Sequence, residues 1–177
     1  MSATAPARPG ADEYASYYEK YVSLVPDADL LETLGRQGAE TLALLRGLDE
    51  GRAAHRYEAG KWSVKQLVGH LNDTERLFSY RALAISRGDR APLPGMDQEE
   101  WMAGADFDAR TLSDLADEFA AVRAATLHLL RHLSPEAWAR RGTASDNEVT
   151  VRALAYIIAG HEAHHVRILR ERYLSEG

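Results

Sequence analysis

The chain has 177 residues, a length that fits one domain. Hydrophobic residues make up 45% of it and charged residues 27%, which is a globular composition and argues against disorder. The net charge is −6, so the chain lacks the surplus of cations that binding to a phosphate backbone requires, and nucleic acid is a poor candidate partner.

The absence of cysteine narrows the chemistry further. A chain without cysteine has no disulfides, iron–sulfur clusters, thiolate metal sites or thiol nucleophile. Any thiol used in a reaction must therefore arrive as a substrate. The first residues, MSATAPARPGADEY, contain no apolar run of signal-peptide length, and no segment approaches the ~18 apolar residues of a membrane span. We expect a cytoplasmic protein without a membrane partner.

The N-terminal region divides into two parts. Residues 1–11 hold two prolines and a glycine and predict a flexible tail, which leaves 12–177 as a single domain. Over 12–24, tyrosines recur at spacings of three and four and indicate a short helix laid against that domain.

Four longer segments carry apolar residues at the spacing of a helix. They span 28–48, 63–87, 111–133 and 150–174. No stretch shows sustained alternation of apolar and polar residues, so we predict an all-α four-helix bundle. Gly35 and Gly38 in the first segment would let another helix approach closely.

Capping residues mark where these helices begin. Asp29 stands at the start of the first helix, Ser63 and Gln66 form a capping box for the second, and Thr150 caps the fourth. The connection over 88–110 is long enough to run the length of a bundle, which makes parallel second and third helices feasible. Ser-Pro-Glu at 134–136 opens a further short turn in the next connection.

Three of the seven histidines lie in one hexapeptide, Gly-His-Glu-Ala-His-His at 160–165. His161 and His165 are four residues apart and so share one face of a helix. Isoleucine and leucine flank them at the same spacing, so both imidazoles project from an apolar stripe toward the core. This pattern favours a metal site over a pair of hydrogen-bonded core histidines, and imidazole binds Zn, Ni, Cu or Fe well.

His70 is the candidate third ligand. It lies about 10 Å from the start of its helix, and His165 lies about 13 Å from the end of the last helix. The two heights agree within a turn if these helices are antiparallel. Parallel helices would instead separate the ligands by about 6–12 Å along the axis. Asp73 is either an acid that orients the His70 ring or a solvated helix charge.

Two other metal motifs overlap this segment. His161-Glu162-x-x-His165 spells HExxH, in which the glutamate of zinc proteases activates water. Ile168 and Glu171 stand where an extended metzincin pattern needs glycine and histidine, so the context does not fit. Di-iron bundles need ExxH on two helices, and one copy is present. We expect Glu162 on the surface or as an acid behind the ligands.

A second pair of histidines, His128 and His132, lies beside the apolar seam of the third helix, close in sequence to Arg123 and Arg131. Cations near a helix C-terminus complement its dipole. We therefore expect this pair on the surface.

Two motifs together resemble the DinB superfamily, which includes DinB/YfiT-like metal-dependent hydrolases and relatives of thiol-dependent S-transferases. They are KWSVKQLVGHL-x-D-x-E over 61–75 and AGHEAHH over 159–165. The resemblance covers roughly 25–177 and implies an up-down-down-up bundle and a homodimer. It also implies a divalent metal, Zn or Ni first and Fe or Mn as further candidates. The implied ligands are His70, His161 and His165, with His164 beside them and not a ligand.

Three functions stay open. Three neutral imidazoles leave metal positions free, as catalytic sites do. The metal either holds a low-molecular-weight thiol, such as bacillithiol or mycothiol, for transfer to an electrophile, or it generates metal-bound hydroxide for hydrolysis. The third function is a non-catalytic metal-binding or stress-response module. Hydrolysis wants a positioned acid or base, and the core-facing stripes show no clear inward carboxylate. Thiol transfer with a small-molecule substrate is therefore slightly favoured, and Arg76, Arg81 and Arg167 either hold an anionic thiol carrier or form a solvated face.

Overall fold

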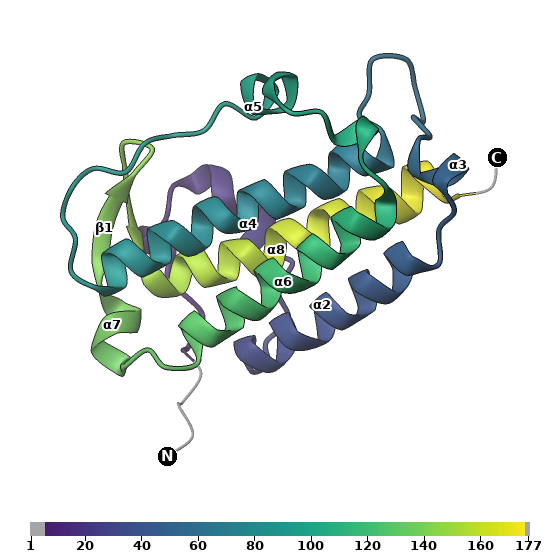
Figure 1. The fold of residues 1–177 in the computed structure, drawn as a ribbon. Coiled ribbons are helices and arrows are strands. Elements are labelled where there is room, and N and C mark those ends of the chain that lie inside the picture. The colour runs from purple at the N-terminus through teal and green to yellow at the C-terminus, as the bar shows by residue number, and fades with distance from the viewer. Residues whose placement is uncertain (1–5, 176–177) are drawn as a thin grey trace.

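The computed structural model describes residues 6–175. Four long helices lie side by side as a bundle (Figure 1), and each falls within one of the four segments that periodicity predicts. They are α2 (Leu30–Arg46), α4 (Val64–Ser86), α6 (Leu112–Leu130) and α8 (Val151–Ile168). A π-helical turn, Leu169–Tyr173, extends α8. The prediction of a four-helix bundle is confirmed.

The helices begin at the predicted capping residues. The Asp29 carboxylate accepts a hydrogen bond from the backbone N–H of Glu32, and the Thr150 hydroxyl accepts one from that of Ala153. Ser63 and Gln66 make the reciprocal capping box, each at 3.0 Å. These side chains satisfy backbone N–H groups that have no partner in the first turn of a helix.

Contacts between the helices define their directions. Arg46, at the end of α2, donates to Asp117 near the start of α6 at 3.0 Å, so these two helices are antiparallel. Asn72, in the third turn of α4, donates to the carbonyl of Leu115 at the start of α6, so α4 and α6 run the same way. Figure 1 shows the crossover between them returning along the whole bundle.

Shorter elements occupy the connections and the N-terminal region. They are α1 (Glu19–Val22), α3 (Glu50–Ala53), α5 (Gln98–Gly104), α7 (Pro135–Ala139) and 3-10 turns at Ala11–Glu13, Ser16–Tyr18 and Phe107–Ala109. Ser134 caps α7 with Pro135 at its first position, as predicted. The helix expected over 12–24 is broken into the first two turns and α1, because Tyr14 has extended backbone angles.

The expectation of an all-helical chain without strands is wrong at one place. Strands β1 (Arg141–Ala144) and β2 (Asn147–Thr150) form an antiparallel hairpin that leads into α8. Ser145 and Asp146 make its turn with positive φ angles of 51° and 61°. Four-residue strands are too short for alternation to be recognised, and Ser-Asp is a weaker turn signal than Asn-Gly.

Part of the expected flexible tail is held in place. The Arg8 guanidinium donates to the backbone carbonyls of Val22 and Val25, at 2.9 and 2.5 Å, and Pro9 is buried. The tail expected over 1–11 is therefore ordered from at least Arg8 onward, and residues 1–5 lie outside the described residues. Within 6–175, no helix combines the length and the apolar character that crossing a membrane requires.

The apolar core is in two parts. One cluster packs the hairpin, α7 and the adjoining ends of α4, α6 and α8, and the other packs α3, α5 and the opposite ends. Between them, the middle turns of the long helices bury polar side chains: Thr41, His70, Thr74, Glu75, Arg123, Thr126, His161 and Glu162. This polar layer holds the functional candidates.

Candidate metal centre

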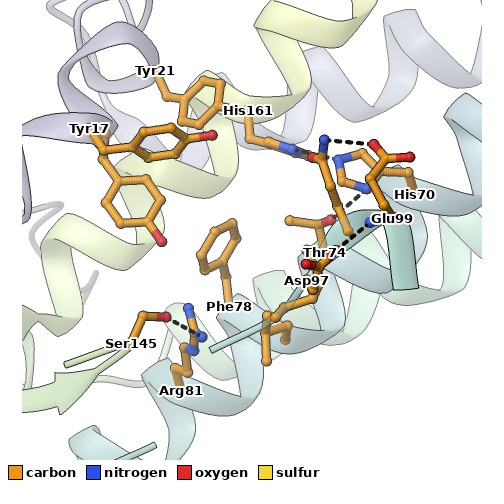
Figure 2. A pocket seen from close by; sticks show the side chains of 14 residues that line it. Tyr17, Tyr21, His70, Thr74, Phe78, Arg81, Asp97, Glu99, Ser145 and His161 are labelled. Carbon is orange, nitrogen blue, oxygen red and sulfur yellow. Dashed lines mark hydrogen bonds between the residues drawn. The ribbon is translucent and has the colours of Figure 1, made fainter. Parts of the chain in front are cut away.

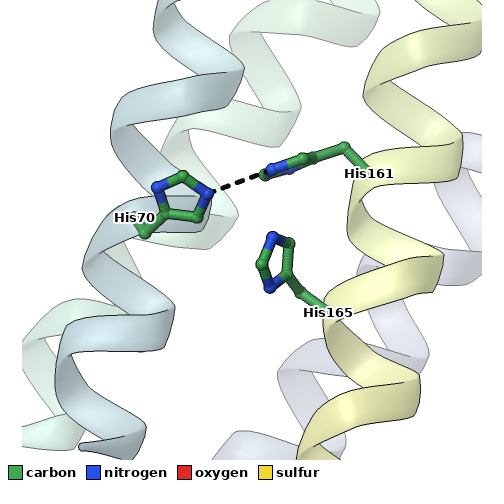
Figure 3. A group of neighbouring side chains, drawn as sticks. All are labelled: His70, His161 and His165. Atoms are coloured by element: carbon green, nitrogen blue, oxygen red, sulfur yellow. Dashed lines mark hydrogen bonds between the residues drawn. The ribbon is translucent and has the colours of Figure 1, made fainter. Parts of the chain in front are cut away.

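Three histidines converge in the polar layer. His70 projects from α4, and His161 and His165 project from α8 toward it (Figure 3). One ring nitrogen of each lies within 4.8 Å of the others, and the Nε2 atoms of His70 and His161 are 3.1 Å apart. The structure thus brings together the three side chains that the sequence selects.

The backbone explains this convergence. His161 and His165 are separated by about one turn, so their rings lie on one face of α8 and meet edge to face, with centroids 4.4 Å apart. The ring of His70 lies 5.0 and 4.9 Å from these two rings. Residue counts predict that His70 and His165 lie at matching heights if their helices are antiparallel. Figure 1 shows α4 and α8 running in opposite directions, and the histidines meet.

Burial keeps all three imidazoles neutral near pH 7. Desolvation lowers the pKa of His70 to about 4 and is the main cause that lowers the pKa of His165 to about 3. It also lowers the pKa of His161, with the neighbouring His165 and His70 adding to the effect. A neutral imidazole offers a free lone pair, which a divalent metal requires of a ligand. The chemistry and spacing of this donor set therefore fit a metal ion.

A hydroxyl supports the ring of His70. The Thr74 Oγ1 atom lies 3.3 Å from His70 Nδ1, one turn further along α4, and can orient the ring. Asp73 does not take this role. It is partly exposed, and its carboxylate lies 3.9 Å from the Arg76 guanidinium. Of the two interpretations left open for Asp73, the solvated helix charge is the one the structure supports.

The remaining histidines lie outside the cluster. His164 packs its ring against Tyr21 and His165, at 5.3 and 5.1 Å, and its nitrogens are not among the converging atoms. His128 and His132 are exposed, as predicted.

Glu162 departs from its prediction. It is 2% exposed and faces away from the histidines, toward α2 and α6. The Thr41 hydroxyl donates to it at 2.6 Å, and the Arg123 guanidinium pairs with it at 2.7 Å. Arg123 also makes two hydrogen bonds to Glu75, at 2.8 and 2.7 Å. Glu162 is therefore neither a surface residue nor an acid behind the ligands.

Glycine makes the space for this ion-pair cluster. A Cβ atom at Gly38 would lie 3.0 Å from Arg123 Cγ, so the predicted close approach at this glycine is made by an arginine side chain. Nothing lies within 4 Å of the corresponding position at Gly35. The burial of Arg123 does not follow from its sequence neighbours, because Arg131 and His128 predict a basic surface.

The histidines open onto a cavity of about 420 Å³. His70, Thr74 and His161 form part of its wall, and Asp97 and Glu99, at the start of α5, form another part (Figure 2). His165 faces a neighbouring cavity of about 270 Å³, and Glu99 lines that one as well. The expectation of no inward carboxylate is wrong in two ways: Glu75 and Glu162 are buried on the long helices, where they pair with Arg123, and the crossover supplies Asp97 and Glu99 to the cavity wall.

These features define a class of protein: a four-helix bundle with three histidines, two of them buried, on two facing helices and with an adjacent cavity. Comparison with known families agrees. The model of the DinB superfamily matches residues 33–169, and the chain belongs to this superfamily.

Two known proteins are similar to this chain. A protein of Oceanobacillus iheyensis named "Putative metal-dependent hydrolase" is 32% identical over 72 residues, which span 40% of this chain and 39% of the relative. The solved structure of YfiT from Bacillus subtilis, described as "a probable metal-dependent hydrolase with an unusual four-helix bundle topology", superposes with a TM-score of 0.68. That match covers 96% of this chain and 94% of YfiT at 16% identity, and it establishes the likeness of fold.

Proposed function

We propose that the protein is a metal-dependent hydrolase whose metal is held by His70, His161 and His165. The observation that carries the proposal is the opening of this neutral three-histidine cluster onto two neighbouring cavities that the Glu99 carboxylate also lines. The names of the two relatives point the same way.

The ligand set suits Zn or Ni, because imidazole is a good ligand for both. A divalent ion bound there would supply Lewis acidity, which lowers the pKa of water and polarises a substrate carbonyl or phosphoryl oxygen. Three protein ligands leave a position free for such chemistry. His70 is further held by Thr74, so the donor set is partly oriented by the protein itself.

Glu99 is the candidate general base. It lines both cavities: the one with His70 and His161 in its wall, and the one that His165 faces. Glu99 therefore lies where the two cavities adjoin. Gln98 Nε2 donates to the Glu99 carboxylate at 3.2 Å. In this role Glu99 accepts a proton from the attacking water and returns it to the leaving group.

Asp97 holds Glu99 in place. Its carboxylate accepts hydrogen bonds from the backbone N–H groups of Glu99 and Glu100, at 2.9 and 3.1 Å, and so caps α5. A carboxylate at a helix N-terminus is also favoured by the helix dipole. Asp97 is therefore a positioning residue for the α5 turn that carries Glu99.

The presence of these acids changes the order of the two chemistries. Thiol transfer is favoured from the sequence because an inward carboxylate is missing there. Once Asp97 and Glu99 line the cavity, that argument no longer applies. Thiol transfer becomes the alternative outcome of the test, and a non-catalytic metal-binding module becomes the third.

The test compares Glu99→Gln with Glu100→Gln, its exposed neighbour on α5, which does not line either cavity. Metal-loaded wild type is assayed against a panel of model esters and amides, with and without bacillithiol, mycothiol or glutathione. We expect thiol-independent cleavage, a fall in kcat of roughly 100-fold or more for Glu99→Gln, and little change for Glu100→Gln. Turnover that requires a thiol would replace hydrolysis with transfer. No turnover in any arm would favour the binding module.

A further inference from the structure

Arg81, on α4, is a buried cation without an anionic partner. The residue is 2% exposed. Its guanidinium donates to two neutral acceptors, the carbonyl of Pro94 at 2.6 Å and the Ser145 hydroxyl at 3.0 Å, and its buried Nε atom has no hydrogen-bond partner. Among the described residues, no carboxylate lies within 4.0 Å of it.

Such a group is costly unless something compensates it. A guanidinium stays charged at any physiological pH, and a buried charge that lacks a counter-charge destabilises the fold. Arg123, which is 4% exposed, shows the usual solution in this protein, since two carboxylates surround it. Arg81 instead keeps its Nε donor without a partner, whereas the donors of Arg123 pair with Glu75 and Glu162. An anion entering from the cavity would complete its environment.

Arg81 faces the same cavity as the histidines, at its other end. Figure 2 shows Arg81 and Ser145 across the cavity from His70 and His161, with Phe78 between them. The Arg81 guanidinium carbon lies 5.6 Å from the centre of the Phe78 ring. Arg81 follows His70 by eleven residues on α4, roughly 16 Å along the helix axis.

The other charged residues of the cavity are consistent with an anion bound at the Arg81 end. Asp97 and Glu99 are its acidic residues, and Asp97 is already engaged by two backbone N–H groups of α5. The two carboxylates repel an anion from their part of the wall. Arg81 is therefore the side chain of the cavity that can bind one. Between the two ends the wall is aromatic, with Phe78, Tyr17 and Tyr18.

We propose that the cavity binds an elongated substrate with an anionic oxygen group, which Arg81 and Ser145 hold while the remainder extends along the aromatic wall toward the histidines. The inference rests on the proposed function for the reactive end and names the substrate class: a carboxylate- or phosphate-bearing molecule with an apolar or aromatic middle. Guanidinium is the side chain best suited to either group, because its donors match two oxygens.

The experiment measures binding without turnover. Titration calorimetry is run on the full chain, as purified and after removal of metal by a chelator, with circular dichroism to show that helix content is kept. The probes are 4-phenylbutyrate, phenyl phosphate and the neutral 4-phenylbutanamide. We expect at least one anion to bind about 10-fold or more tightly than the amide, with or without metal. The tighter of the two anions identifies the group.

Variants then assign the effect to Arg81. Arg81→Gln is expected to weaken the anion about 10-fold or more and to leave the amide unchanged, and Arg81→Lys to retain part of the preference. Arg87→Gln, an exposed arginine at the end of the same helix, is the matched control. Equal affinity for anion and amide in wild type overturns the proposal without any variant. Anion binding that disappears on metal removal also overturns it. A protein that shows the Arg81 effect but no hydrolysis would contradict the proposed reaction alone.

Discussion

Two polar clusters meet on α8 and face in opposite directions. His161 faces α4 with His165 and His70, whereas the next residue, Glu162, faces α2 and α6 with Arg123. Both clusters are buried in the same layer between the two apolar parts of the core. They differ in whether their polar atoms already have partners.

The charges of the ion-pair cluster compensate one another, although Thr41 and Glu162 also line a cavity of about 170 Å³. Arg123 reaches Glu75, Glu162 and the carbonyl of Leu34, and Thr41 adds a donor to Glu162. Burial raises the pKa of Glu162 and lowers that of the histidines, but the charge of Arg123 opposes the shift at Glu162. The histidine cluster has no such charge and opens onto a cavity. The histidine cluster, whose ring nitrogens keep free lone pairs, is therefore the candidate functional site, and the cluster whose charges are paired is the candidate contributor to stability.

The largest expected effect separates the two clusters by metal content. Wild type should hold about one divalent ion per chain, because three histidines on two helices make one site. His70→Ala and His165→Ala should each lose most of it, whereas His164→Ala and the exposed His128→Ala should keep it. Elemental analysis of purified protein measures this. Full metal in both ligand variants would remove the proposed site, and loss in Glu162→Gln would break the division between the clusters.

The second effect concerns stability. Arg123→Leu leaves two buried carboxylates without their cation, which we expect to cost about 3–5 kcal/mol of unfolding free energy. For a chain of this size that lowers Tm by roughly 10 °C. Arg46→Leu, which breaks the exposed pair with Asp117, should cost less than about 1 kcal/mol. Thermal and urea unfolding compare the two. A similar small loss for both would show that the Arg123 cluster adds no net stability.

A third polar group, packed against the start of α8, extends the comparison to the dependence of stability on pH. Glu13 is buried against the start of α8, where Arg152 donates to it at 2.6 Å and Thr150 at 2.8 Å. Burial alone would raise its pKa, but hydrogen bonds from Arg152, Gly10 and Thr150 lower it from 4.5 to about 2.

Because the folded pKa lies below the unfolded value, this group stabilises the fold above about pH 4.5 and loses that contribution as pH falls toward 2. The contribution is about 2–3 kcal/mol. Glu13→Gln should therefore lower stability at pH 7 and flatten its decline between pH 5 and 2, as measured by urea unfolding across this range. An unchanged acid limb in the variant would contradict the assignment.

The smallest effect tests how α1 covers the face of α8 that carries His161. A Cβ atom at Gly160 would lie 2.0 Å from the backbone oxygen of Tyr21, whose ring packs 5.2 Å from that of His161. Gly160→Ala must shift α1 off α8, at a cost of about 1–3 kcal/mol. Gly35→Ala, with open space around it, should instead be neutral or stabilising by up to about 1 kcal/mol. Unfolding curves and amide exchange over α1 report both, and equal effects would exclude the predicted clash.

Much of the bundle is readable from short stretches of sequence. Ser63 with Gln66, and Thr150 with Ala153, act within three residues, and the histidines of α8 lie one turn apart. Each of these features depends on neighbours along the chain, so their spacing predicts them. The pairing with His70 also follows, because helix rise converts residue number into height once the helices are taken as antiparallel.

What only the tertiary structure decided is where distant side chains meet. The sequence around Arg123 predicts a basic surface, but α2 and α8 enclose it. Arg81 is one of three arginines with two open interpretations, and only the crossover and the hairpin place it in one cavity with Asp97 and Glu99. The hairpin itself is four residues a side and leaves too short a pattern. Capping and periodicity are local and are written in neighbouring residues. Burial of a charge depends on partners from other elements, which lie far apart in the sequence: 48 residues for Arg123 and Glu75, and 121 for Thr41 and Glu162.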